Sequence, residues 1–281
     1  MPRGEAITAL VLGAVTRDVV RAASGEERER PGGVATWAGT ALARLGARVR
    51  IVTRLRPADY DALLGPLRAE GAEIRALPSR HTTTYALDYS GDSDVHELRA
   101  TSDPIGAGDV PESWRDADLI HLGPLHQRDV DPSALESLRG FAGLDVQGLV
   151  REPGDREALP ALLARADVVQ VSEEELPALV GDEPLERFAR RFALSEVLVT
   201  HGARGVTVLT PEARRELPAA PSSGRHRIGA GDVFLACYLL QRVHRADPVT
   251  AASWAARACA EKVDRGQIPK GFDPDRGSGA E

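Results

Sequence analysis

The sequence predicts an α/β fold with a mostly parallel central sheet and helices on both of its faces. The first observation is a continuous apolar run at residues 7–12, bounded by Gly13, which is typical of a strand buried on both faces. The second is the alternation of such runs with stretches of helical periodicity. In sheets of this kind ligands bind beyond the carboxyl ends of the strands, so we expect the site there.

The expected elements follow one another in this alternating order. The chain has 281 residues, of which 42% are hydrophobic, so it is long enough to bury a large core. Strands are expected at residues 7–12, 48–53, 72–77, 119–122, 144–146, 168–171 and 197–200. Helices are expected at residues 36–45, 58–70, 157–165 and 185–192.

Two polar stretches interrupt this order, at about residues 15–35 and 80–100. The second contains Tyr85, Leu87 and Tyr89 at a period of two, which is typical of a half-exposed strand. Because both stretches follow predicted core strands, we expect them to pair into a small β lid over the site. The alternative is that they are surface hairpins without a role.

Composition and charge narrow the class of protein. The net charge of −7 and the pI of about 5.6 give no basic face, so no nucleic-acid partner is expected. No apolar run approaches the length of a membrane span. Cys237 and Cys259 match no zinc spacing and indicate buried, reduced thiols in a cytoplasmic protein. We expect one domain over residues 1–281, ending in a disordered tail at 272–281.

The hexapeptide IGAGDV occurs twice, at residues 105–110 and 228–233. A Gly-Ala-Gly-Asp turn presents backbone N–H groups to an anion only where a helix begins. After the first copy, Pro111 disfavours a helix and no apolar periodicity follows. The first copy is therefore expected to be a solvent-exposed loop without a catalytic role.

The second copy leads directly into the apolar sequence VFLACYLLQRV. Gly229, Ala230 and Gly231 would form the first turn of a buried helix, with their N–H groups and the helix dipole directed at an anion. Asp232 would lie in the same turn. The alternative is that its carboxylate is stabilised there by the dipole without a further function.

These residues carry a resemblance to a known family. GAGDVF at the start of an apolar helix resembles the C-terminal signature of the PfkB (ribokinase-like) family of carbohydrate and nucleoside kinases. The pair Gly32-Gly33, followed by a helix that ends in ALARLGARV, resembles the family's N-terminal signature. Three shorter segments resemble family motifs and occur in the same order: LGAVTRD at 12–18, VSEEE at 171–175 and THGARG at 200–205. Together they cover nearly the whole chain.

The resemblance implies a ribokinase-like fold and an enzyme that transfers the γ-phosphate of ATP to a hydroxyl of a sugar, cyclitol or nucleoside. Asp232 would be the general base, and the backbone of Gly229–Gly231 would form the anion hole. Glu175 would help to hold Mg²⁺ through water; the alternative is a glutamate that merely favours a helix N-terminus. The resemblance is also compatible with a homodimer formed through the lid.

The resemblance implies that four residues bind the acceptor: Asp18, Gly32, Gly33 and Trp37. It implies that five residues contact the nucleotide: Ser172, Thr200, Gly202, Gly205 and Arg227. Each group has a structural alternative. An acidic residue after a strand is common, Trp37 can anchor its helix to the sheet, the glycines can shape a tight hairpin, and Arg227 can be a solvated loop cation.

The chain departs from the family pattern at several positions. His226 and Arg227 stand where the family's second signature usually begins Asp-Thr. In relatives activated by potassium that Asp belongs to the monovalent-cation site, so little dependence on potassium is expected here. Trp37 replaces a sugar-contacting Asn, which disfavours ribose, and Ser172 and Ala256 replace two further Asn residues. These departures leave open a non-catalytic relative that binds a sugar or nucleotide as a sensor or partner.

Overall fold

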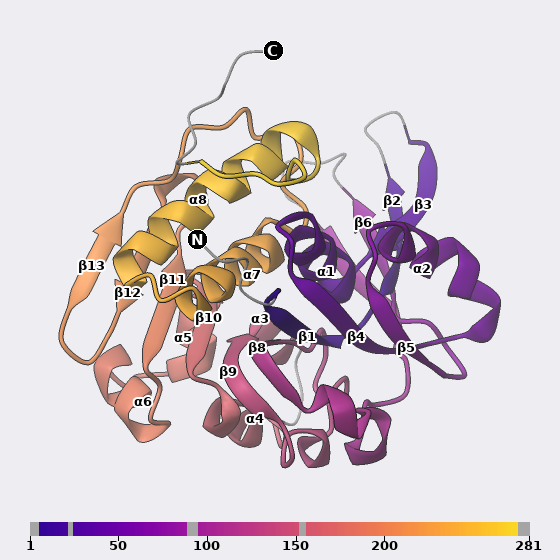
Figure 1. Cartoon of the computed structure of the whole chain (residues 1–281), viewed down its shortest axis with the longest axis horizontal. Helices are drawn as coiled ribbons and strands as arrows, with labels where there is room; N and C mark the ends of the chain where they lie inside the picture. The colour runs from indigo at the N-terminus through magenta and orange to yellow at the C-terminus, as the bar shows by residue number, and fades with distance from the viewer. Residues whose placement is uncertain (1–5, 22–24, 89–94, 152–155, 275–281) are drawn as a thin grey trace.

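The computed structural model describes residues 6–21, 25–88, 95–151 and 156–274. Their main feature is a nine-stranded sheet, shown in Figure 1. Seven neighbouring strands run parallel; in sheet order they are β5 (Glu73–Pro78), β4 (Arg48–Leu55), β1 (Thr8–Gly13), β8 (Asp116–Gly123), β9 (Arg139–Asp145), β10 (Val168–Ser172) and β11 (Glu196–Thr200). Two antiparallel strands, β12 (Val206–Leu209) and β13 (Arg214–Leu217), complete one edge. The predicted mostly parallel sheet is confirmed.

Helices cover both faces of this sheet, as predicted. One face carries α1 (Val34–Arg44), α2 (Tyr60–Ala69), α7 (Ala230–Val243) and α8 (Pro248–Arg265). The other carries α3 (Gln147–Arg151), α4 (Leu159–Arg165), α5 (Leu176–Val180) and α6 (Leu185–Arg191). Successive residues of β1 alternate between the two cores, because strand side chains alternate in direction: Ala9 packs on the first and Leu10 on the second. Figure 1 shows α1, α7 and α8 together on one side of the sheet.

The two polar stretches pair into a small four-stranded sheet, so the predicted lid is confirmed. It consists of β3 (Glu27–Gly32), β2 (Thr16–Arg21), β6 (Thr84–Asp88) and β7 (Val95–Ala100), in that order. Strands β2 and β6 pair in parallel, with Asp18 opposite Tyr85, although they come from distant parts of the chain. This pairing brings the two segments together beside α1 and α2 in Figure 1. Tyr89 lies outside the described residues.

The first IGAGDV copy is only partly the exposed loop that we expected: Ala107 and Gly108 are exposed, but the ends of the segment and Asp109 are buried. Ile105 and Val110 are each 1% exposed, and Ile105 forms an isolated parallel bridge with Val130. Asp109 ends a short 3-10 turn, accepts a hydrogen bond from the N–H of Gly106 at 2.7 Å, and binds Nη2 of Arg54 at 2.8 Å. The ends of the segment are buried because Ile105 and Val110 belong to the core on the sheet face that carries α3 to α6. Among the described residues, no α-helix follows it directly, as predicted from Pro111; only a short 3-10 helix at Glu112–Trp114 does.

The end of the described chain returns to the α7–α8 layer. Both cysteines are free thiols, Cys237 buried and Cys259 partly buried. The ring of Phe272 packs edge-on against Trp254 with centroids 5.8 Å apart. Residues 275–281 of the expected tail lie outside the described residues. In the described ranges, none of the helices combines the length and the apolar composition that crossing a bilayer requires.

We expect Asp109→Asn to lower the free energy of unfolding by about 1 kcal/mol or more, since it weakens charge-assisted hydrogen bonds to Arg54. Thermal unfolding would show this as a decrease in Tm of about 2–4 °C. The matched control is Asp116→Asn, because Asp116 is exposed and its nearest guanidinium nitrogen, on Arg139, is 3.8 Å away. Equal effects of the two substitutions would contradict the structural role of Asp109.

Candidate active site

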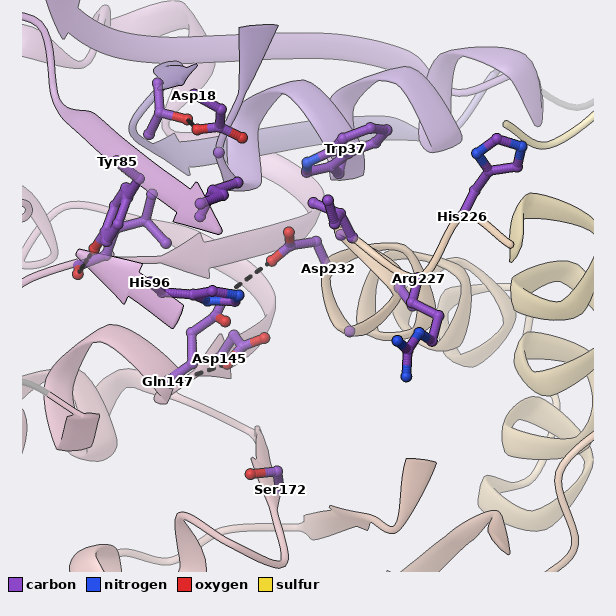
Figure 2. Close-up of a pocket in the computed structure, with 18 of the residues that line it drawn as sticks. Asp18, Trp37, Tyr85, His96, Asp145, Gln147, Ser172, His226, Arg227 and Asp232 are labelled. Atoms are coloured by element: carbon purple, nitrogen blue, oxygen red, sulfur yellow. Dashed lines mark hydrogen bonds between the residues drawn. The ribbon is translucent and has the colours of Figure 1, made fainter. Parts of the chain in front are cut away.

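A cleft of about 1040 Å³ lies between the sheet, the start of α7 and the lid. The carboxyl ends of β9, β10 and β11 contribute Asp145, Ser172 and Thr200 to its wall. The lid contributes Tyr85 and His96. The cleft therefore lies at the edge of the sheet where a parallel α/β fold binds its ligands. Figure 2 shows Asp232 in its middle, with Asp18 and Trp37 on one side and Gln147 and Asp145 on the other.

The second IGAGDV copy forms the N-terminus of α7, as predicted. Gly229 is the N-cap, with a φ of 73°, and helical hydrogen bonding begins with the N–H of Val233 on the carbonyl of Gly229. The N–H groups of the first turn have no carbonyl four residues earlier within the helix. Ala230 turns its N–H back onto the carbonyl of Arg227 at 3.0 Å. The N–H groups of Gly231 and Asp232 are therefore the helical donors left for an anion.

Asp232 is 6% exposed at this terminus and faces the cleft. Burial raises the pKa of its carboxyl above the ordinary value for aspartate, and the nearby charge of Asp18 acts in the same direction. Lys262, Arg151 and a hydrogen bond of 3.2 Å donated by Nε2 of Gln147 oppose this shift in pKa. A buried carboxylate with a raised pKa, held by charge and one amide, has the properties of a proton acceptor.

A second group of side chains lies across the cleft from α7, and the sequence analysis did not identify most of it. Asp145, 4% exposed, accepts a hydrogen bond of 3.0 Å from Nε2 of Gln170. Burial and the charges of Asp232 and Glu175 raise its pKa. Glu175 accepts a hydrogen bond from the N–H of Ser172 and pairs with Arg151 at 2.5 Å. Two carboxylates, Asp145 and Glu175, thus lie on this wall, and the charge of Asp232 also acts on Asp145, so a cation here would relieve their repulsion.

Asp18 lies at the lid end of the cleft. Its carboxyl accepts a hydrogen bond of 2.6 Å from the hydroxyl of Thr16, and burial raises its pKa. A Cβ on Gly32 would lie 2.0 Å from an Asp18 oxygen, so the glycine leaves room for this carboxyl. Gly33 lines the cleft, whereas Gly32 is not part of its wall. Arg30 also reaches the cleft, and its charge lowers the pKa of Asp18 against the effect of burial.

Trp37 lies in the first turn of α1 and forms part of the wall. A Cβ on Gly229 would lie 2.3 Å from its ring, so the indole packs directly against the N-cap of α7. Two cations lie over the ring, Lys262 with Nζ 4.6 Å from the centroid and Arg30 at 6.0 Å. Trp37 is therefore half-buried between the two helices, with one part facing the cleft.

Of the five residues expected to contact the nucleotide, three line the cleft and two do not. Ser172, Thr200 and Arg227 line the cleft, and Figure 2 shows the Arg227 side chain extending below the start of α7. Gly202 and Gly205 lie outside the wall of the cleft, in the turn of the β11–β12 hairpin. At Gly205, with a φ of 117°, a Cβ would lie 1.9 Å from the carbonyl oxygen of Leu217. The alternative explanation for these two glycines, a tight hairpin, describes their place in the structure.

Comparison with known proteins agrees with this geometry. The sequence profile of the pfkB family carbohydrate kinases matches residues 6–268. The chain belongs to this family. It is therefore a pfkB-family carbohydrate kinase, a phosphotransferase that acts on the sugar or nucleoside class of acceptors.

This pfkB kinase is similar to relatives with several acceptors. It is 27% identical to a cytidine kinase from Thermococcus kodakarensis, over 82% of this chain and 86% of that protein. It is 26% identical to a fructokinase from Klebsiella pneumoniae, over 80% and 81% of the two chains. Among solved structures, a pyrophosphate-dependent kinase in the ribokinase family, complexed with a pyrophosphate analog and myo-inositol, superposes with a TM-score of 0.79 at 25% identity. That match covers 94% of this chain and 97% of the other.

We expect Gly229→Ala to destabilise this pfkB kinase more than Gly46→Ala does. Both glycines have positive φ, 73° and 90°, so both substitutions carry the same backbone strain of about 1–2 kcal/mol. A Cβ at Gly46 meets open space, whereas one at Gly229 meets the Trp37 ring. The clash adds roughly 1–3 kcal/mol to the loss in free energy of unfolding, measured by chemical denaturation. Combining Gly229→Ala with Trp37→Ala removes that added loss, and strictly additive effects would contradict the contact.

Proposed function

We propose that this pfkB kinase transfers the γ-phosphate of ATP to a hydroxyl of a sugar, cyclitol or nucleoside, with Asp232 as general base. The observation that carries the proposal is the position of the Asp232 carboxylate. It lies at the N-terminus of α7, beside the N–H groups that attract an anion, and it faces the cleft. A proton acceptor and an anion-binding turn thus lie within one helical turn. Phosphoryl transfer to an alcohol requires these two groups next to each other.

In this reaction the acceptor oxygen attacks the terminal phosphorus while its proton passes to the Asp232 carboxylate. The bond between that phosphorus and the bridging oxygen of the leaving diphosphate breaks. The N–H groups of Gly231 and Asp232, together with that of Gly229, stabilise the negative charge on the transferring phosphoryl oxygens. The hydrogen bond from Gln147 keeps the Asp232 carboxylate directed into the cleft.

The residues across the cleft fit a magnesium ion. Asp145 and Glu175 are buried carboxylates whose mutual repulsion contributes to the raised pKa of Asp145, and carboxylate oxygen is a ligand type that Mg²⁺ prefers. No group of three His, Cys, Asp or Glu side chains in the described ranges forms a complete metal site. Mg²⁺ usually retains waters and binds phosphate oxygens, so Glu175 would hold it through water. When bound, the ion neutralises charge on the donor phosphates.

The acceptor would occupy the lid end of the cleft. Asp18 offers a buried carboxylate to acceptor hydroxyls, and Trp37 offers an aromatic face. In the described part of the chain, Nε and Nη2 of Arg30 are buried without a hydrogen-bond partner, which leaves them for acceptor oxygens. Relatives act on cytidine and fructose or bind myo-inositol, so the three acceptor classes remain the candidates.

A second candidate donor is pyrophosphate. The glycines expected to shape the nucleotide loop, Gly202 and Gly205, lie outside the wall of the cleft, while Arg225 and Arg227 line it. Guanidinium groups suit phosphate oxygens and do not require a base to be bound. A structural relative of 25% identity is pyrophosphate-dependent. The test is product formation from Mg-ATP and from Mg-pyrophosphate with fructose, myo-inositol and cytidine as acceptors; no phosphorylated product with any pair would contradict the proposal.

Asp232→Asn is expected to lower kcat by roughly 10²–10⁴, the usual effect of losing a general base. Donor affinity should change little, because the helix N-terminus remains. The matched control is Asp109→Asn, the same change in the other copy of the hexapeptide, which should leave kcat within about twofold because Asp109 lies outside the cleft wall. Steady-state kinetics on both variants decides the matter, and equal losses would show that Asp232 is not the base.

The pH dependence of kcat/KM should reveal the raised pKa of Asp232. The base acts only when it is deprotonated, so kcat/KM falls as the pH decreases through that pKa, at a pH above the ordinary range for aspartate. Gln147→Leu removes the hydrogen bond that favours the ionised form, so the acid limb should move to higher pH by up to about one unit. An acid limb that stays in place in this variant would assign the titration to another group.

A further inference from the structure

Lys262 places an ammonium group in the interior behind the anion-binding turn. The residue is 1% exposed, in the last turns of α8. Its Nζ donates hydrogen bonds to the backbone carbonyls of His226, at 2.7 Å, and of Ile228. It also lies 4.6 Å from the centre of the Trp37 ring. Two carbonyl dipoles and one aromatic face thus converge on a single positive charge.

This arrangement is unusual for a buried lysine. A buried ammonium normally has a carboxylate partner, because removal of the charge from water is costly. In the ranges that the structure describes, no carboxylate lies within ion-pair distance of Lys262. Burial accordingly lowers its pKa to about 8, while the charge of Asp232 favours its protonated form. The partners of the Lys262 ammonium are thus backbone carbonyls and not a carboxylate. Carbonyl oxygens of this kind are the usual ligands of a bound alkali cation.

The two carbonyls belong to the loop that leads into α7. His226 stands where potassium-activated relatives have the Asp of their monovalent-cation site, and Ile228 directly precedes the N-cap Gly229. The imidazole of His226 carries no negative charge, so it does not replace that carboxylate as a cation ligand; Figure 2 shows its ring directed away from Asp232. A potassium ion between these carbonyls would lie against the ammonium of Lys262 and be repelled. The residues present therefore do not fit a monovalent ion.

We propose that the Lys262 ammonium takes the place of a bound monovalent cation, holding the 226–228 loop so that the anion-binding turn is in position for the donor phosphates. Lys262 is thus a positioning residue, which acts through the backbone of the loop. The proposal rests on the proposed function, since the turn is assigned there to the transferring phosphate.

The choice of lysine is consistent with this role. The chain contains only two lysines, Lys262 and Lys270, among 35 lysine and arginine residues. A lysine ammonium is a compact point charge that approximates an alkali cation, whereas the planar guanidinium of arginine directs its donors in a fixed fork. Lys270 is 68% exposed at its side chain and pairs with Glu70 at 3.1 Å, so Lys270→Met is a matched control outside the site.

The test uses the full chain in buffers whose only monovalent cation is K⁺, Na⁺ or tetramethylammonium, at constant ionic strength. Wild-type protein and Lys270→Met should show the same rate in all three. Lys262→Met keeps the packing of the side chain without the charge and should lower kcat/KM for the donor by roughly 10–100-fold, since small displacements of positioning groups have effects of this size. Lys262→Ala opens space at the carbonyls, and K⁺ or ammonium, but not tetramethylammonium, should restore part of its rate in a saturable manner.

Hydrogen exchange gives a readout that does not require catalysis. The amides of residues 224–231 should exchange faster in both Lys262 variants than in Lys270→Met, and KCl should slow their exchange in Lys262→Ala. If the wild-type protein phosphorylates no acceptor but these amides still exchange faster in the Lys262 variants than in Lys270→Met, this proposal stands while the proposed function fails. The proposal would be overturned by wild-type activity that requires K⁺, by full activity of Lys262→Met in tetramethylammonium, or by a folded Lys262→Ala that no cation restores.

Discussion

The position of the first turn of α7 is the constraint on which the rest of the site depends. In the mechanism that we propose, Asp232 has to be buried and also close to N–H groups that bind phosphate, and the N-terminus of a buried helix satisfies both conditions. One backbone conformation and two contacts fix this terminus: Gly229 adopts a positive φ, the indole of Trp37 packs against it, and the Lys262 ammonium binds the carbonyls just before it. Residues from α1, α7 and α8 therefore have to be in place before the cleft can hold an acceptor next to a donor phosphate.

The electrostatics of the cleft follow from this burial. Asp18, Asp145 and Asp232 all have raised pKa values for the same first reason, desolvation. Around Asp232 the opposing charges of Lys262 and Arg151 favour the ionised base, whereas around Asp145 the like charges of Asp232 and Glu175 disfavour ionisation. The two carboxyl groups are thereby suited to different tasks, one to accept a proton and the other to meet a cation. The two groups are both aspartates, so the difference in their properties comes from their surroundings and not from the residue type.

Much of the fold could be predicted from the sequence because strands buried on both faces leave continuous apolar runs, and the lid was marked by two polar stretches between them. The site was predicted where a local motif exists, at Gly229–Asp232. It was missed where side chains from distant segments converge, as at Arg30 and Gln147. Lys262 did leave a signal: it continues the buried stripe of α8 formed by Ala251, Ala255 and Ala258. A charged residue on an apolar helix face shows that a partner exists, but its partners are backbone carbonyls, which leave no trace in the sequence.

The two copies of IGAGDV show how far a motif can determine chemistry. In the first copy Asp109 accepts hydrogen bonds from the N–H of Gly106 and from Arg54. Both of its carboxylate oxygens therefore already have partners within the fold. In the second copy the same aspartate lies inside a helix, where its own turn cannot offer it those donors. Among the described residues, its hydrogen bond comes from Gln147, at 3.2 Å. The difference lies in the residues that follow. After the first copy, Pro111 leads only into a short 3-10 helix, whereas the apolar run after the second copy forms α7. The Asp232 carboxylate, which has fewer hydrogen-bond donors than that of Asp109 and faces the cleft, is therefore the one that we propose for proton transfer.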